Sequence, residues 1–167
     1  HRAIIYLKQI LPEVTEERAP LRVSFRLGVG VYAWVGDVTR EATIHSVELV
    51  PASSPPAFGF DISSSGTAHV RLEGQYAVWR AENFPGSEAT SPIEGINTAS
   101  AEAPEAVQEF GTLPTIPVLP GTRRSLSLQL LEDLPPGDYV LDLNGAVAGV
   151  AIDQAIRFEV RSEPGEE

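Results

Sequence analysis

The residues with the most reactive side chains in this chain are its histidines and carboxylates. His45 and His69 fall in two different extended segments, so they could meet across a sheet, with Glu48 or Glu73 nearby as further metal ligands. Two histidines that are not clustered in the sequence are more typical of strand residues facing solvent. A small hydrolase or metal-dependent enzyme built on His45 and His69 is therefore the least favoured of the three hypotheses that we consider for this chain. We expect the protein to bind no metal and no other cofactor.

No catalytic arrangement accompanies the many carboxylates. No serine lies in a nucleophile elbow, and no histidine stands at a diagnostic spacing from a serine and an aspartate. Gly28 and Gly30 imitate the start of a phosphate-binding loop, but they lie inside an extended segment that no helix follows. Alternate glycines in a strand instead leave room on one face for a large neighbour or for a closely approaching backbone. We predict that the protein is not an enzyme.

The composition excludes several classes of partner. The formal net charge is −11, and no basic stripe exists that would neutralise the phosphates of a nucleic acid or bind an anionic membrane surface. No apolar run approaches the roughly 20 residues that span a bilayer. The chain lacks cysteine, which excludes disulfides and thiolate chemistry. It starts at His1 and contains no methionine, so we expect a mature protein or a processed fragment from which any export signal has already been removed.

The segment that must position any binding residues is Leu21–Val35, where apolar and other residues alternate over about fifteen positions. A period of two indicates a β-strand with one apolar face. Strands usually have about five or six residues, so we expect this strand to reach beyond a single sheet. The apolar face must be covered by the protein itself or by a partner.

The remainder of the chain predicts an all-β, immunoglobulin-like sandwich with an N-terminal strand extension. Short alternating segments separated by proline and glycine turns indicate about eight strands and no amphipathic helix. Tyr139 follows a Pro-Gly-Asp turn and is expected at a sandwich corner with its hydroxyl bonded locally. We divide the chain into an N-terminal segment, a sandwich and an acidic tail, at 1–35, 36–162 and 163–167. Within the sandwich, 81–112 is expected to be a long, mobile insertion with a helical turn near Pro104–Glu109.

The order of these features resembles that of periplasmic pilus chaperones of the chaperone–usher type. The alternating run at 21–33 is similar to the last strand of the first domain in that family, and a short apolar segment ending in proline precedes it. Further segments are similar to parts of the second domain: Ala68–Trp79, Val118–Gly121, Tyr139–Leu143 and Arg157–Val160. The resemblance spans most of the chain through short motifs. It implies an immunoglobulin-like fold, a periplasmic or otherwise exported location, and a role in assembly of a pilus, or fimbria.

The resemblance also implies a binding mode. An apolar strand would enter the incomplete groove of a pilin-like subunit as a donated strand, with these residues at the contact: Val23, Phe25, Arg26, Leu27, Val29 and Val31. Family members hold the partner's terminal carboxylate with a basic residue on this strand. Gly30 occupies that position here, and Arg26 is the nearby substitute on the same polar face.

We therefore expect a chaperone-like or assembly module that binds a protein partner by β-strand addition. The partner would be a pilin-like subunit or a second copy of the chain, which would then form a homo-oligomer through the N-terminal strand. The second hypothesis is a structural or adhesive surface module whose long strand is buried internally. Neither the client nor the oligomeric state follows from the sequence.

Overall fold

The computed structural model of the chain describes residues 1–10, 24–33, 35–51, 53–98, 101–131 and 134–161. These residues form two compact units, His1–Val38 and Thr39–Glu167. Val23 and the acidic tail at 163–167 lie outside the described residues. No helix in the described ranges has the length and apolar character needed to cross a membrane.

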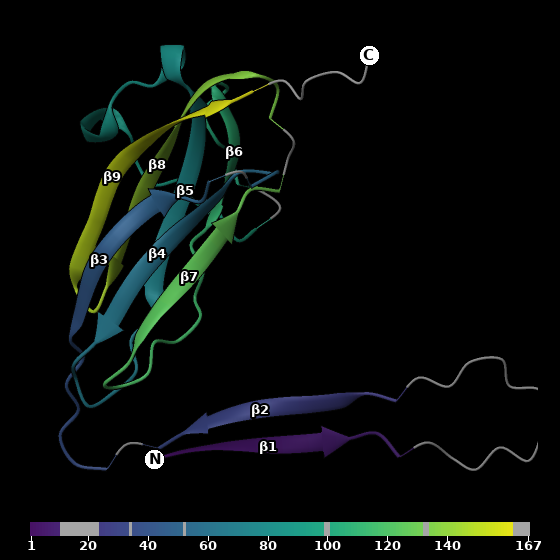
Figure 1. Cartoon of the computed structure of the whole chain (residues 1–167), viewed down its shortest axis with the longest axis vertical. Helices are drawn as coiled ribbons and strands as arrows, with labels where there is room; N and C mark the ends of the chain where they lie inside the picture. The colour runs from purple at the N-terminus through teal and green to yellow at the C-terminus, as the bar shows by residue number, and fades with distance from the viewer. Residues whose placement is uncertain (11–23, 34, 52, 99–100, 132–133, 162–167) are drawn as a thin grey trace, which may run out of the picture. The chain divides into compact units, whose positions relative to one another are not determined.

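The second unit is a sandwich of two antiparallel sheets (Figure 1). The smaller sheet has the order β3-β4-β7, with β3 at Ala42–Leu49, β4 at Ala57–Ser64 and β7 at Arg123–Gln129. The larger has the order β6-β5-β8-β9, with β6 at Val107–Thr112, β5 at Leu72–Arg80, β8 at Gly137–Val147 and β9 at Val150–Val160. Counted along the second unit, the first, second and fifth strands (β3, β4 and β7) thus form one sheet. The third and sixth strands (β5 and β8) are central in the other sheet, as in immunoglobulin-like sandwiches. The expected all-β sandwich is confirmed.

Alternation along the strands builds the core between the sheets. On β4, Phe58 and Phe60 are fully buried, and on β8 so is Leu141. Phe158 of β9 joins the two layers, because its ring packs edge-on against Phe58, with centroids 5.3 Å apart, and stacks on Tyr139 at 5.5 Å. Aromatic pairs in such geometries add stability beyond the area that they bury. The core therefore depends on contacts between side chains of both sheets.

Tyr139 closes the corner between β7 and β8. Its ring is buried, and its hydroxyl donates a hydrogen bond of 2.6 Å to the carbonyl oxygen of Pro135, four residues earlier. This geometry is the tyrosine corner of immunoglobulin-like sandwiches. The local hydrogen bond expected for Tyr139 from the sequence is confirmed.

Replacing Tyr139 by phenylalanine is expected to lower the free energy of unfolding by about 1 kcal/mol, because the ring stays in place while the Pro135 carbonyl loses its donor. Urea denaturation followed by circular dichroism measures the change. An unchanged midpoint would mean that the corner is held by ring packing alone.

The segment 81–112 carries more regular structure than the sequence indicated. It holds two 3-10 turns, η1 at Ala81–Asn83 and η2 at Ser87–Ala89, and then β6. Near Pro104–Glu109, where a helical turn was expected, the chain makes one turn closed by a 2.9 Å bond from the Val107 amide to the Pro104 carbonyl, but no helix follows, because β6 begins at Val107 and pairs with β5. Phe84 packs edge-on against Trp79, with centroids 6.2 Å apart. The segment is therefore anchored on side chains of the sheet, which its own composition does not reveal.

The first unit is a hairpin of β1 (Arg2–Lys8) and β2 (Arg26–Tyr32), paired antiparallel. The expectation of one strand over Leu21–Val35 is corrected, because β2 has seven residues in the described part of the chain. Among the described residues, backbone hydrogen bonds just beyond the two strands join Gln9 to Phe25 and Ala33 to His1, each at 3.0 Å. The apolar run before Pro12 is thus the partner strand of the predicted one.

Candidate functional site: the β1–β2 hairpin

One face of the hairpin is apolar and exposed. On β2 the exposed fractions are 69% for Phe25, 61% for Leu27, 44% for Val29 and 40% for Val31. Residues directly opposite each other in an antiparallel pair share a face, so β1 extends this surface. We call the set the apolar face of the hairpin: Ala3, Ile5, Leu7, Phe25, Leu27, Val29 and Val31. Four of the six residues predicted to bind a partner thus lie together on one exposed surface, whereas Val23 lies outside the described residues and Arg26 is on the opposite face.

The opposite face explains the two glycines. Tyr6 lies across from Gly28, and a β-carbon at Gly28 would lie 3.2 Å from the Tyr6 ring. The guanidinium of Arg26 lies over the same ring, 4.0 Å from its centroid, in a cation–π contact. The prediction that these glycines leave room for a large neighbour is confirmed at Gly28. Arg26 points to this polar face, away from the apolar one.

The hairpin also presents a row of backbone groups. Phe25 and Ala33 of the second strand both bond toward β1. Because bonding directions alternate along an antiparallel strand, the peptide groups of Arg26, Gly28 and Gly30 point away from β1. No strand among the described residues pairs with this edge of β2. The edge is a template for one more strand, and the glycines leave it without bulky side chains.

Lys8 is a basic residue that the sequence reasoning missed. It lies opposite Arg26 in the register of the two strands, so two cations stand side by side at one end of the polar face. Lys8 and Arg26 are separated by residues 9–25 in the chain, and only the pairing of β1 with β2 brings them together. The sequence alone does not reveal this register, and for this reason Lys8 was not predicted. Gly30, in contrast, lies opposite Ile4.

The two sandwich histidines have different neighbours. His45 Nε2 lies 2.9 Å from the Ser63 hydroxyl on the next strand. His69 lies near Arg71 and Arg40, whose charges oppose protonation of its ring. Within the described ranges, no three histidine or carboxylate side chains are grouped to hold a metal ion.

His69 makes the stability of the sandwich sensitive to mild acid. Partial burial lowers the pKa of His69 below its ordinary value of 6.5, and the charges of Arg71 and Arg40 lower it further. The unfolded chain therefore takes up a proton at higher pH than the folded chain, so stability falls as the pH drops through about 6.5. We expect the urea midpoint of His69→Gln to decline less than that of the unchanged protein between about pH 7.5 and pH 5.5. Equal declines would show that His69 does not contribute.

Comparison with protein-family models, curated proteins and solved structures gives no match. The geometry of the hairpin and the resemblance of its sequence are therefore the basis for a function.

Proposed function

We propose that this protein is a non-enzymatic, chaperone-like or assembly module of an exported pilus or surface system, and that it binds a protein partner by β-strand addition. The observation that carries the proposal is the combination on β2 of an exposed apolar face with an edge that no described strand pairs with. Each of these features contributes separately to strand addition.

The side chains supply the affinity of such a complex. Burying a valine, leucine or phenylalanine side chain stabilises by roughly 1.5–3 kcal/mol. Phe25, Leu27, Val29 and Val31 are spaced two residues apart, so they would fill successive pockets of a groove in the partner's sheet. The outward peptide groups of Arg26, Gly28 and Gly30 would hydrogen-bond to the partner strand and fix its register.

The two cations at the end of the hairpin add a candidate for recognition of the partner's chain end. Arg26 and Lys8 lie opposite each other on the polar face. A guanidinium forms strong, charge-assisted hydrogen bonds with a carboxylate. These residues are positioned to replace the basic anchor that the resemblance places at Gly30. The partner we propose is a pilin-like subunit with an incomplete sheet.

Co-production with pilin-like subunits from the same source tests the proposal. We expect a complex in size-exclusion chromatography with light scattering, and slower hydrogen exchange in residues 24–33 than in the chain alone. If the isolated chain is a clean monomer whose residues 24–33 are already protected, and no subunit changes this, strand addition is excluded. A surface module with an internally covered strand would then explain the chain better.

A further inference from the structure

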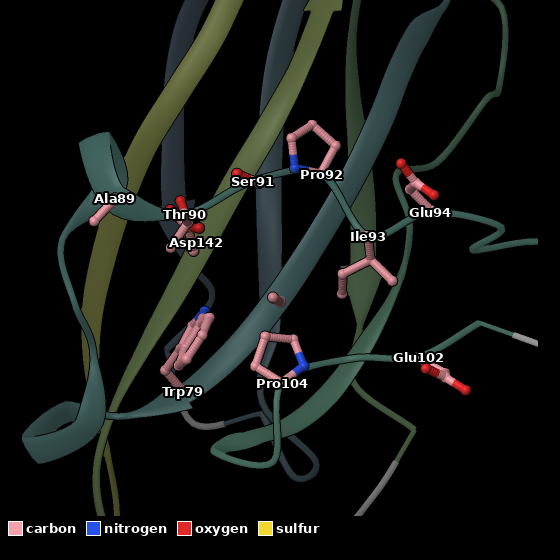
Figure 2. Close-up of a pocket in the computed structure, with 11 residues that line it drawn as sticks. Trp79, Ala89, Thr90, Ser91, Pro92, Ile93, Glu94, Glu102, Pro104 and Asp142 are labelled. Atoms are coloured by element: carbon pink, nitrogen blue, oxygen red, sulfur yellow. The ribbon is translucent and has the colours of Figure 1, made fainter.

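A hollow of about 590 Å³ lies over the outer face of the larger sheet, on the side opposite the core between the sheets. Its floor is formed by Ala77 and Trp79 of β5 and Asp142 of β8, and its walls by residues 89–94 together with Glu102 and Pro104 (Figure 2). This volume is in the range of small-molecule sites, which are mostly apolar with a few convergent polar groups. The segment between β5 and β6 thus encloses a space above the sheet.

Two buried polar atoms around this hollow have no hydrogen-bond partner. One is the indole Nε1 of Trp79, whose residue is only 7% exposed, and the other is the side-chain oxygen of Gln75. Gln75 lines a smaller, adjoining hollow that shares Thr90 and Asp142 with the first. They are the only such side-chain atoms in the described part of the chain. An unpaired buried group costs free energy, so their convergence on one place points to a ligand.

Asp142 is the third polar group at this place. Its residue is 6% exposed, and its Oδ1 accepts a hydrogen bond of 3.2 Å from the Ser87 hydroxyl. In Figure 2 the nitrogen of Trp79 points toward Asp142 and Thr90, whereas the carboxylates of Glu94 and Glu102 are directed outward from the rim. The polar groups around the two adjoining hollows are therefore one N–H donor, from Trp79, and two acceptors, the carboxylate of Asp142 and the amide oxygen of Gln75.

The hydrogen-bonding groups of the site favour a ligand with hydroxyl groups over a cation. A hydroxyl group can accept a hydrogen bond from Trp79 and donate one to Asp142 or Gln75 at the same time. A cation would pair with Asp142 but leave the Trp79 N–H without an acceptor. The apolar walls at Pro92, Ile93 and Pro104 suit the C–H faces of a ring that carries hydroxyls.

We propose that this hollow, with Trp79 and Asp142 as its polar contacts and Gln75 in the adjoining smaller hollow, binds a small neutral polyhydroxylated ligand such as one sugar unit of a glycan. This site is on the sandwich and does not depend on strand addition by the hairpin.

Tryptophan fluorescence tests the proposal directly. The chain has two tryptophans, so Trp34→Phe leaves Trp79 as the only one. In this variant we expect a saturable change of emission with at least one of D-glucose, D-galactose, D-mannose and N-acetyl-D-glucosamine. Asp142→Asn should weaken the binding about tenfold, because the hydrogen bond from the ligand hydroxyl would go to a neutral amide oxygen and not to a carboxylate. Glu48→Gln, the same charge change on β3 of the other sheet, should leave it unaltered.

Trp79→Phe provides a second variant, since it removes the N–H and keeps an aromatic ring. Saturation-transfer NMR, which needs no tryptophan, should show the same sugar bound at least about tenfold more weakly. The proposal is overturned if none of the four sugars binds, or if a sugar binds to Trp79→Phe and to Asp142→Asn as tightly as it binds to the unchanged protein. It is also overturned if spermidine binds at Asp142 and the sugars do not, which would indicate a cation site.

Discussion

The double variant Leu27→Asp, Val29→Asp is expected to abolish partner binding while the sandwich remains folded. Both side chains belong to the exposed apolar face of the hairpin, on the strand whose edge is open to pairing. In a complex formed by strand addition, each aspartate would enter an apolar groove without a counter-charge. Burying an unpaired charge costs several kcal/mol, so we expect at least about a 100-fold loss of affinity.

A matched variant on the other face of the hairpin makes this test specific. Ile4 is 60% exposed and lies opposite Gly30, on the side away from the apolar face. Ile4→Asp therefore introduces the same charge into the same hairpin and should leave binding nearly unchanged, whereas Leu27→Asp alone should weaken it strongly. Size-exclusion chromatography of each variant mixed with the pilin-like subunit measures how much complex forms. Urea denaturation should show the same sandwich transition in every variant, because the hairpin and the sandwich are separate compact units. Equal loss in Ile4→Asp and Leu27→Asp would contradict strand addition through the apolar face.

Local patterns were sufficient to predict the fold class. Alternating segments and proline-glycine turns indicated a sandwich, and the turn before Tyr139 indicated a corner that the structure shows. Both features depend on residues close together in the sequence. The length of β2 was overestimated because alternation continues through Leu21–Val35, whereas β2 occupies only Arg26–Tyr32 among the described residues. An alternating pattern shows which residues can share a face but not where pairing ends.

The candidate sites were harder to predict because they depend on contacts between distant segments. Lys8 meets Arg26 only through the register of the hairpin. The hollow on the sandwich needs the segment after β5 to pack over β5 and β8, and its composition, rich in alanine, glutamate and proline, resembles that of a solvated loop. Trp79 and Asp142 have the sequence context of ordinary strand residues. Only the structure shows that both are buried and line the same hollow.

Gly74→Ala is expected to destabilise the sandwich by at least about 3 kcal/mol. Gly74 has a φ of +127°, which side chains rarely adopt, and it lies opposite Gly145 where β5 and β8 approach closely. A β-carbon at Gly74 would lie 2.3 Å from the carbonyl oxygen of Asn144 and 2.4 Å from the Cα of Gly145. Both neighbours are backbone atoms of a central strand, so the overlap can be relieved only by separating the two strands. The carbonyl of Gly74 also accepts a 3.0 Å hydrogen bond from Leu113, which such a shift would weaken.

Gly121→Ala separates the two causes of this effect. Gly121 also has a positive φ, +68°, but no atom lies within 4 Å of the position that its β-carbon would occupy. It should therefore cost only the backbone strain of a left-handed residue, about 1 kcal/mol. The comparison uses the free energy of unfolding in urea for both variants. Equal losses would show that strain, and not the close approach of β5 and β8, accounts for the glycine at position 74. A much larger loss in Gly74→Ala would show that the close approach of the strands that carry Trp79 and Asp142 depends on this glycine.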